Sequence, residues 1–531
     1  MDDPASVLAR HRKLLTPGAA RILNADSDLM DGLLRKLSSG EQMPLIIGEA
    51  ELGSMASSLS RAPVLAPPIP APVRQAVPPV HDPGMVRIGE AITLQQMRSI
   101  PALAPDRTAK FVSSDTEGDV RILFDPSEHM GTKGKIEDFH KLFQDRYRTV
   151  RELLRKQHGS LHPLEDIGKL YETEEQVRLI GMVQNVKATK NGHTLFDMED
   201  PTGTVRVLVS KNKEIFRNKL VDDETIGIVG RYSRDNGSSG IVFADELIRP
   251  DVAQVHRRRP CSDPGAIAAF ISDIHIGSKH FLHKEWRRMI GWLNGSDGSS
   301  AGSDITDRIK YLVVCGDLVD GIGIYPDQDQ DLEIPDISHQ YEALAEILSG
   351  VPAHIHVIMV PGNHDAVRLA EPQPAIPKEF RDCFSNERIR FTTNPAFLSL
   401  SGVHVTAYHG KSIDDMVQLY KDVTYENPLE GMREMLRSRH MSLTYGMRNQ
   451  LSPEEMDMMV IREVPDVFVT GHVHRFGSSD YRGVHLIQAG TWQSQTSFQK
   501  MMNFKPQPAK VALLDLSTFE MRTYDAGGGL T

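Results

Sequence analysis

The stretch "VIMVPGNHDAVR", residues 357–368, joins a run of apolar residues to a polar turn. The apolar run ends at Pro361 and predicts a buried strand, and four small or polar residues then follow: Gly362, Asn363, His364 and Asp365. Because Gly, Asn and Asp are common turn residues, the stretch taken alone is consistent with an ordinary turn at a strand end. A functional role requires that other strands of the chain end in the same way.

Four more apolar runs in the second half of the chain end in polar clusters. They are "AIAAFISDIHIG" (266–277), "IKYLVVCGDLVDG" (309–321), "VHVTAYHGKS" (403–412) and "PDVFVTGHVHRFG" (465–477). Helix-like stretches such as "QYEALAEILSG" (340–350) separate some of these runs. Buried strands that alternate with helices predict an α/β layer architecture from about residue 265 onward, with function at the carboxyl ends of the strands.

The polar clusters draw on a restricted set of residue types, namely His, Asp and Asn beside Gly. In chain order they are Asp273-x-His275, Gly316-Asp317, Gly362-Asn363-His364-Asp365, His409-Gly410 and Gly471-His472-x-His474. Turn chemistry accounts for Gly and Asp, but it does not account for His in four of the five clusters. Carboxylate oxygen and imidazole nitrogen are ligands that suit Mn, Fe, Zn or Mg. We therefore predict a centre of two divalent metal ions bridged by one carboxylate, in which glycines let the backbone approach closely.

The bulk composition is that of an ordinary soluble globular protein. The chain has 531 residues, of which 40% are hydrophobic and 25% charged. Three widely spaced cysteines without a CxxC pair indicate a reducing compartment, and the sequence shows neither a signal-peptide core nor a long apolar run. We therefore expect a cytoplasmic protein with no membrane segment. The formal net charge of −11 means that contact with nucleic acid must rest on local basic patches or on metal ions.

The first third of the chain divides into segments of different composition. Residues 1–60 carry helix-like apolar spacing and predict a small helical N-terminal domain. The Pro-rich segment "RAPVLAPPIPAPVRQAVPPVHDPG" (61–84) predicts a semi-rigid linker that tethers this domain. Residues 85–174 show no defined fold apart from an amphipathic helix from Ile136 to Lys156 with a basic face.

Residues 175–250 consist of short β-rich runs separated by Gly, Asn and Asp turns. The runs include "VRLIGMVQNVKAT" and "HTLFDMEDPTGTVRVLVS", whose central "DPTG" predicts a hairpin. This pattern predicts a small OB-fold β-barrel. Such barrels bind single strands or dock proteins; docking is favoured here because no clear set of exposed aromatic residues is present, and DNA binding stays open.

The order D-x-H, G-D, G-N-H-D, H-G, G-H-x-H resembles that of the calcineurin-like metallophosphoesterase superfamily. The resemblance implies an α/β β-sandwich flanked by helices over residues 265–531. It implies that one metal ion is held by Asp273, His275 and His474, that the other is held by Asn363, His409 and His472, and that Asp317 bridges them. It further implies that His364 is the catalytic residue at the leaving oxygen. Asp365 would orient its imidazole and raise its pKa.

The layout of helical piece, linker, barrel and phosphoesterase domain resembles more narrowly the small subunit of archaeal family D DNA polymerase, a relative of the B-subunits of eukaryotic replicative polymerases. The stretches "GDLVDGIGIYP" (316–326), "YHGKSIDDM" (408–416) and "RHMSLTYG" (439–446) carry this likeness. It implies a 3′–5′ proofreading exonuclease that acts on single-stranded or frayed 3′ DNA ends. The implied partners are DNA, a large catalytic polymerase subunit in a heterodimer and, as a further candidate, a sliding clamp. The implied cofactors are two divalent ions, with Mn favoured over Mg, Fe or Zn.

Two other functions stay open at this point. One is a free-standing metallophosphoesterase on phosphoproteins or small phosphodiesters, which needs neither a barrel nor a Pro-rich tether. The other is a non-catalytic scaffold subunit, which has no chemical need for a complete ligand set with His364. Nearby residues allow a supporting role or a structural one: Asp320 on a metal ligand, Arg368 and Arg475 on phosphate or in salt bridges, and Tyr325 and Trp492 in base stacking or core packing.

Overall fold

The computed structural model describes residues 14–15, 46–47, 119–164, 176–213, 219–233, 240–295, 304–501 and 503–530. Apart from two short parallel strands, β1 (Leu14–Leu15) and β2 (Ile46–Ile47), the predicted helical domain at 1–60 and linker at 61–84 lie outside the described residues. The elements that follow belong to the second of two compact units, 92–531.

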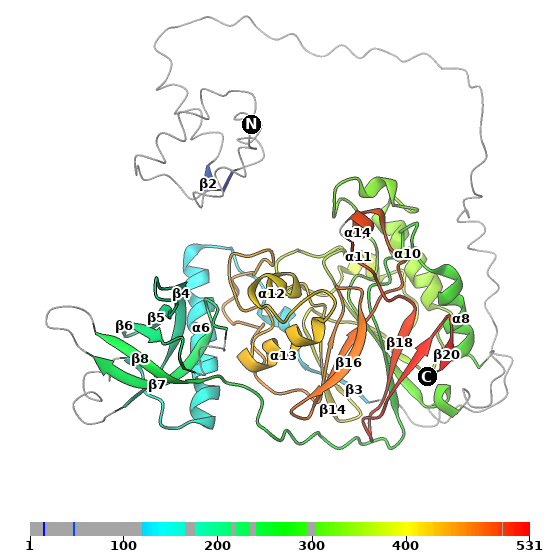
Figure 1. Ribbon diagram of the computed structural model, residues 1–531. Coiled ribbons are helices and arrows are strands. Elements are labelled where there is room, and N and C mark those ends of the chain that lie inside the picture. The colour runs from blue at the N-terminus through cyan, green and yellow to red at the C-terminus, as the bar shows by residue number, and fades with distance from the viewer. Residues whose placement is uncertain are drawn as a thin grey trace, which may run out of the picture. The chain divides into compact units, whose positions relative to one another are not determined.

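A seven-stranded sheet forms one half of a β-sandwich (Figure 1). Its order is β12-β11-β10-β9-β18-β19-β20. The strands are β9 (Ile267–Ile271), β10 (Ile309–Cys315), β11 (His356–Val360), β12 (Ile389–Phe391), β18 (Lys510–Asp515), β19 (Met521–Asp525) and β20 (Gly529–Leu530). β9 to β12 pair in parallel, and every residue of β9, β10 and β11 is buried, which explains their continuous apolar runs.

A six-stranded sheet of order β16-β17-β15-β14-β13-β3 forms the other half. Its strands are β3 (Val120–Phe124), β13 (Ala396–Leu400), β14 (Val403–Tyr408), β15 (Val467–Thr470), β16 (Phe476–Tyr481) and β17 (Val484–Ala489). Side chains of both sheets, among them Phe270, Val313, Leu398 and Val469, form one buried core between them. β3 lies in the region 85–174, so the boundary predicted at 265 omits one strand of the sandwich.

Helices cover the outer faces of both sheets. α8 (His283–Leu293) and α10 (Ile337–Leu348) pack on the seven-stranded sheet, where Trp292 and Leu344 join its core. α12 (Ile413–Leu419) and α13 (Pro428–Ser438) pack on the six-stranded sheet through Met416 and Met435. Shorter helices are η2 (Pro126–His129), η5 (Gln328–Gln330), α11 (Lys378–Arg381) and α14 (Ser497–Met501). The predicted α/β architecture is thus confirmed as a helix–sheet–sheet–helix arrangement.

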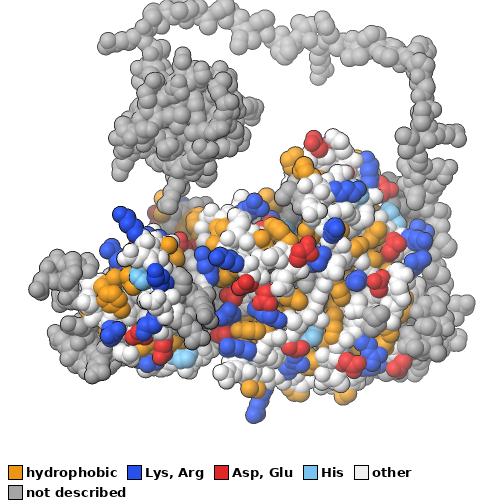
Figure 2. Space-filling view, viewed as in Figure 1, with side chains coloured by type: hydrophobic (Ala, Val, Ile, Leu, Met, Phe, Trp, Pro, Cys, Tyr) orange, Lys and Arg blue, Asp and Glu red, His pale blue; other side chains and the backbone are white. Residues whose placement is uncertain are grey.

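A closed five-stranded barrel occupies the segment predicted to be an OB-fold. It joins β4 (Val177–Ala188), β5 (Thr194–Asp200), β6 (Gly203–Val209), β8 (Ile241–Ile248) and β7 (Thr225–Ser233) in that order. Phe196 fills its core, whereas Phe243 is 41% exposed. On the face shown in Figure 2, hydrophobic side chains lie next to Lys and Arg on the barrel, a surface consistent with either a protein or a single strand.

The predicted amphipathic helix is present as α6 (Ile136–Gln157) and links the barrel to the sandwich. Its Leu154 packs with Ile180 of the barrel and with Val460. Arg146 Nε donates to Asp457 Oδ2 at 2.6 Å, and the two side chains are 1% and 2% exposed. At least one basic residue of α6 therefore holds the helix against the sandwich domain, which contains Asp457, rather than facing solvent.

Replacing Arg146 with Met is expected to lower the free energy of unfolding by about 3–5 kcal/mol, because it leaves Asp457 buried without its cationic partner. Urea denaturation followed by circular dichroism measures this loss. Lys141→Met on the same helix is the matched control, because its ion pair with Glu455 is exposed and screened by solvent, so its loss is expected to change stability little. Equal losses in the two variants would contradict the assignment.

Among the described residues, no helix is long and apolar enough to cross a membrane.

Candidate metal centre

The ends of five strands bring the predicted site residues together. β9, β10 and β11 run in parallel in one sheet, and β14 and β15 run in parallel in the other, so each set ends at one edge. Among the described residues, three groups, of which the first two share His275, place one donor atom of each member within 4.8 Å of the others: Asp273, His275 and His474; His275, Asp320 and His364; Asp317, His409 and His472. Residues nearly 200 positions apart in the chain thus form one cluster.

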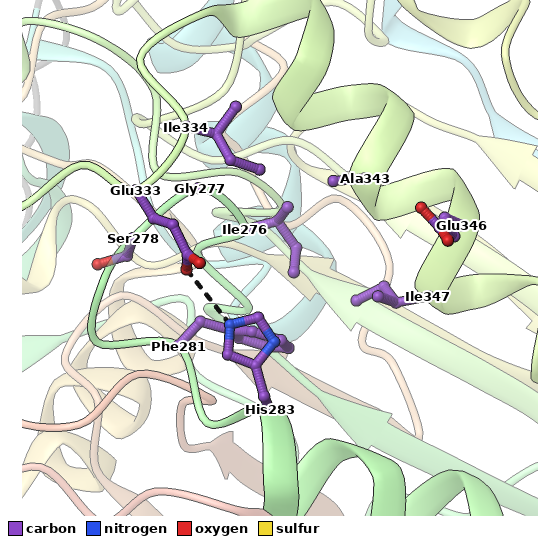
Figure 3. Close-up of a pocket in the computed structure, with 10 residues that line it drawn as sticks. All are labelled: Ile276, Gly277, Ser278, Phe281, His283, Glu333, Ile334, Ala343, Glu346 and Ile347. Carbon is purple, nitrogen blue, oxygen red and sulfur yellow. Dashed lines mark hydrogen bonds and ion pairs between the residues drawn. The ribbon is translucent and has the colours of Figure 1, made fainter. Parts of the chain in front are cut away.

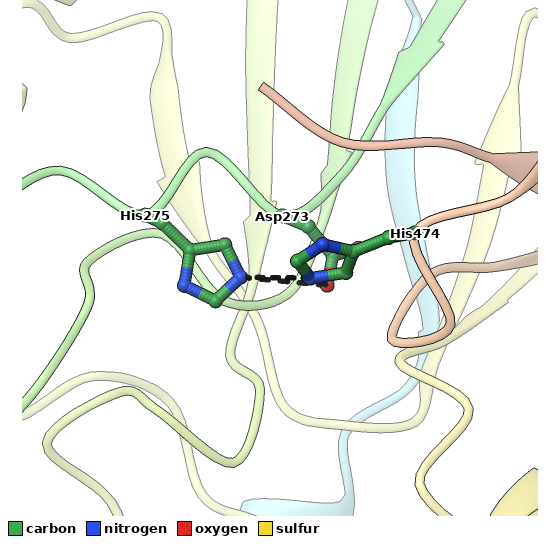
Figure 4. A group of neighbouring side chains, drawn as sticks. All are labelled: Asp273, His275 and His474. Atoms are coloured by element: carbon green, nitrogen blue, oxygen red, sulfur yellow. Dashed lines mark hydrogen bonds and ion pairs between the residues drawn. The ribbon is translucent and has the colours of Figure 1, made fainter. Parts of the chain in front are cut away.

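Asp273, His275 and His474 form the first group (Figure 4). His474 Nε2 lies 3.3 Å from Asp273 Oδ1 and 3.1 Å from His275 Nε2, and all three side chains are buried. Asp273 Oδ2 accepts a hydrogen bond from the backbone N–H of His472. Asp273 Oδ1, in contrast, has no hydrogen-bond partner among the described residues. A buried carboxylate oxygen in that state is unfavourable unless a cation binds it.

Asp317, His409 and His472 form the second group, with Asn363 beside them. His409 Nε2 lies 3.3 Å from Asp317 Oδ2 and 3.2 Å from Asn363 Oδ1. Asp317 Oδ2 is also 3.8 Å from His275 Nε2, which belongs to the first group. The carboxylate of Asp317 therefore lies between the two groups, where it can serve both.

Hydrogen bonds behind the imidazole rings fix which nitrogen atoms face the centre. His275 Nδ1 donates to Asp320 Oδ1 at 3.0 Å, and His409 Nδ1 donates to the backbone carbonyl of Cys315 at 2.9 Å. In the neutral rings the Nε2 atoms therefore turn lone pairs toward the carboxylate of Asp317. Lone pairs and a carboxylate repel each other unless a cation or proton lies between them, so this donor set fits divalent metal ions.

The pKa values of His275 and His409 also indicate that the surrounding carboxylates favour a positive charge at this centre. Burial by itself lowers the pKa of His275, but the carboxylates of Asp273 and Asp320 raise it to about 10. Burial likewise opposes the charged form of His409, and Asp317 raises its pKa to about 9. A metal ion would satisfy the negative charge that otherwise draws protons to these rings.

The backbone around the centre adopts uncommon conformations. Five of the clustered residues have positive φ: Asp273 at 53°, His275 at 55°, Asp317 at 49°, His472 at 67° and His474 at 49°. Such values are rare outside glycine, and they concentrate where surrounding structure enforces a functional geometry. Close packing adds a second constraint, because a Cβ at Gly471 would lie 1.9 Å from Ser272 Oγ.

Comparison with known proteins places this centre in a family. Residues 268–478 match the family described as the DNA polymerase alpha/epsilon B-subunit, and residues 177–249 match the family described as OB-fold nucleic acid binding domain. The DNA polymerase II small subunit of Thermoplasma acidophilum is 40% identical over 381 residues, which cover 72% of this chain and 76% of the relative. The chain belongs to the DNA polymerase II small-subunit family. The family relationship predicted from the domain layout and from the stretches at 316–326, 408–416 and 439–446 is thereby confirmed.

Two further small subunits show similar likeness. That of Methanothermobacter thermautotrophicus is 39% identical over 425 residues, covering 79% of this chain and 86% of the relative. That of Methanocaldococcus jannaschii is 38% identical over 416 residues, covering 77% of this chain and 69% of the relative. The OB-fold match also supports the barrel predicted from the strand pattern.

In this small-subunit chain, His364 lies at the rim of the centre with its side chain 15% exposed. Its Nδ1 donates to the backbone carbonyl of Asp320 at 2.7 Å, and its Nε2 lies 3.9 Å from Asp317 Oδ2. The prediction that its pKa is raised is wrong: burial lowers the pKa of His364, and the attraction of Asp317 does not offset this effect.

The predicted contact between Asp365 and the His364 imidazole is also wrong. Asp365 Oδ2 accepts from the backbone N–H of Gly362 at 2.8 Å and of Leu318 at 3.1 Å, and Oδ1 accepts from the Tyr341 hydroxyl at 3.1 Å. Burial and the nearby charge of Asp317 raise the pKa of Asp365 to about 7. Asp365 therefore ties the ends of β10 and β11 together and acts on the centre through the backbone.

Carboxylates outside the first and second groups contact one ring nitrogen of His275 and one of His472. Asp320 holds His275 in the predicted manner. Asp414 of α12 does the same for His472, with Oδ2 lying 3.2 Å from Nε2, and it also accepts from Lys411 Nζ at 2.6 Å. Asp414 was not predicted from the sequence, although its position five residues after His409, at the end of a strand, was a usable signal.

Replacing Asp414 with Asn is expected to weaken metal binding by about 10- to 100-fold, because the carboxylate that orients His472 is lost while side-chain volume is kept. Calorimetric titration with Mn²⁺ measures the change. The control is Asp422→Asn, an exposed position on the loop that follows α12. Unchanged Mn²⁺ affinity in a folded Asp414→Asn protein would contradict this role.

For Arg368, Arg475 and Trp492, the sequence left open either substrate contact or a structural role. The structure gives each of them structural contacts. Arg368 pairs with Glu454 at 2.8 Å, and Arg475 pairs with Glu426 at 2.8 Å. Trp492 is fully buried in the core. The salt-bridge and core alternatives therefore describe these three residues.

A small cavity lies next to the loop that carries the first group (Figure 3). Ile276, which follows His275, lines it together with Phe281, His283 and Glu333, and His283 Nε2 lies 3.3 Å from Glu333 Oε2. Its volume of about 30 Å³ is too small for a nucleotide. The cavity is therefore a packing feature behind the centre and not a substrate pocket.

Proposed function

We propose that this chain is the 3′–5′ exonuclease subunit of a heterodimeric DNA polymerase and hydrolyses phosphodiester bonds at single-stranded or frayed 3′ ends. The observation that carries the proposal is the position of Asp317, whose carboxylate lies 3.3 Å from His409 and 3.8 Å from His275. The family relationship supports the polymerase role, and the direction of cleavage comes from resemblance. In this proposal the sandwich is a calcineurin-like metallophosphoesterase domain.

The proposed centre holds two divalent ions, with Mn favoured over Mg, Fe or Zn. Asp273, His275 and His474 would hold one ion, Asn363, His409 and His472 would hold the other, and Asp317 would contact both. When bound, two such ions supply an activated water and neutralise charge on the phosphate. The donor set of carboxylate, amide oxygen and imidazole suits these borderline-hard cations.

His364 is the proposed catalytic side chain at the leaving oxygen. The Asp320 carbonyl fixes its Nδ1, so that Nε2 is turned toward the centre. Its partial exposure leaves it accessible to a substrate, unlike the fully buried His409. Because Nδ1 already donates to the Asp320 carbonyl, the protonated ring is the form that could stabilise or protonate the leaving oxygen through Nε2.

A large catalytic polymerase subunit is the proposed partner, because the relatives that this chain resembles are named as small subunits. The two subunits would form a heterodimer in which polymerisation and hydrolysis reside on separate chains.

Digestion of end-labelled single-stranded DNA in Mn²⁺, with and without the co-purified partner, tests the proposal. Stepwise loss of nucleotides from the 3′ end is the expected result. Hydrolysis of bis(p-nitrophenyl) phosphate without DNA degradation would instead indicate a phosphoesterase of another substrate class. Absence of hydrolysis with any divalent metal, in the presence of the partner, would indicate a scaffold subunit.

A further inference from the structure

Residues 494–501, which include α14, and residues 503–505 pass along one side of the centre. Gln499 Nε2 lies 3.0 Å from Nδ1 of His474, a residue of the first group. The backbone N–H of Phe504 donates to the Gln499 carbonyl at 2.8 Å, and Gln495 Nε2 donates to the Phe504 carbonyl at 2.5 Å. Phe504 is thus held close to the centre by a short chain of hydrogen bonds.

Tyr425 lies next to Phe504 and is connected to the second group, that of Asp317, His409 and His472. Its hydroxyl donates to Asp414 Oδ1 at 3.1 Å, and Asp414 in turn contacts His472. The rings of Tyr425 and Phe504 lie 6.1 Å apart, edge to face at 83°. Both side chains are half-buried, so each ring keeps part of its surface open to solvent. Two aromatic residues from distant parts of the chain therefore meet at the rim, each tied to a different half of the centre.

The segment that carries Phe504 is basic, whereas Asp414 and Glu426 lie beside Tyr425. No Asp or Glu occurs between Asp480 and Asp515, whereas Lys500 and Lys505 are present and exposed. Arg475 Nη1 donates to the Lys505 carbonyl at 2.9 Å and anchors that end of the segment. The stretch from 481 to 514 therefore carries a local positive charge in a chain whose net charge is −11.

Aromatic faces beside lysines match the chemistry of an unpaired nucleotide. The flat base stacks on a ring, and the phosphates of the same strand pair with ammonium groups. A base inside a duplex already has neighbours on both faces, so such a surface favours a single strand. A phosphorylated protein side chain or a small phosphodiester offers no base for these rings.

We propose that Phe504 and Tyr425 form a stacking platform for the base of the nucleotide being removed, and that Lys500 and Lys505 bind the adjoining phosphates of that strand. The inference rests on the proposed function and narrows its substrate to an unpaired nucleotide with an intact base.

The test compares cleavage of two single-stranded oligonucleotides, one with an intact 3′-terminal base and one with an abasic 3′-terminal nucleotide. The wild-type heterodimer is expected to prefer the intact end by about 5- to 150-fold in kcat/KM, the range of one base–aromatic stack. Phe504→Leu, which keeps an apolar side chain but removes the ring, is expected to lose most of this preference. Phe504→Tyr is expected to restore it, and Phe243→Ala on the barrel is the control.

Two further measurements separate this proposal from the function on which it rests. Hydrolysis of bis(p-nitrophenyl) phosphate reports on the centre without a base, and the ratio of DNA to small-diester activity is expected to fall in Phe504→Leu. In a His364→Ala background, an oligonucleotide ending in 2-aminopurine reports stacking by loss of emission without cleavage. A full preference for the intact end over the abasic end, or an undiminished emission loss, in Phe504→Leu would overturn the platform. Equal loss of DNA and small-diester hydrolysis in that variant would also overturn it.

Discussion

Replacing Asp317 with Asn is expected to reduce phosphodiester hydrolysis by about 10³-fold or more and to lower the amount of bound Mn²⁺. The carboxylate lies within 3.8 Å of imidazole nitrogens from both groups of donors, so its charge serves both halves of the centre. Asn keeps the volume and one oxygen but removes the negative charge that a pair of divalent ions requires. Metal analysis of the purified protein and hydrolysis of end-labelled DNA measure the two effects.

Asp382→Asn is the matched control for Asp317→Asn. Asp382 follows α11, is exposed and pairs with Lys378, so its loss is expected to leave metal content and hydrolysis unchanged. Full Mn²⁺ occupancy in Asp317→Asn would contradict the bridging assignment, even if hydrolysis were reduced.

Replacing His364 with Ala is expected to reduce hydrolysis by about 10²- to 10⁴-fold while Mn²⁺ binding persists. The reason is geometric: Nε2 lies 3.9 Å from Asp317 Oδ2 at the rim, and Nδ1 is engaged by a backbone carbonyl rather than by a carboxylate. Hydrolysis rates at saturating DNA, together with calorimetric Mn²⁺ titration, separate chemistry from metal binding.

His280→Ala serves as the control for His364→Ala, because His280 lies outside the donor groups and contacts Asp331 at 3.4 Å. Near-normal hydrolysis by His364→Ala would overturn its catalytic role. Loss of bound Mn²⁺ in that variant would instead make His364 a metal ligand.

The sequence is most informative where local pattern and chemistry agree. Buried strands such as β10 and β11 are continuous apolar runs, and their parallel pairing requires that their polar ends meet at one edge. That rule is sufficient to bring together Asp273, Asp317 and His364 from the sequence alone. The barrel strands and α6 are predictable for the same reason, since their periodicities are local.

Properties that depend on side-chain direction or distant pairing were not predictable. Asp365 follows His364 in the chain, but its carboxylate turns back to the amides of Gly362 and Leu318, a choice set by the fold of the two strand ends. The αL backbone at His472 and His474 likewise depends on packing that no local pattern encodes. β3 is only five residues long, and its partner strand lies more than 270 positions away.

The place of β3 makes the β-sandwich discontinuous in the chain. Val120 and Ile122 pair with Leu400 and Leu398 of β13, so the barrel is an insertion between one strand of the sandwich and the rest. A truncated protein beginning at residue 265 would expose the outer edge of β13 with its row of unpaired amide and carbonyl groups. Such an edge recruits strands from other molecules. Expression of residues 265–531 by themselves is therefore a route to aggregation, and the smallest fragment that can remain soluble begins before β3 and retains the barrel.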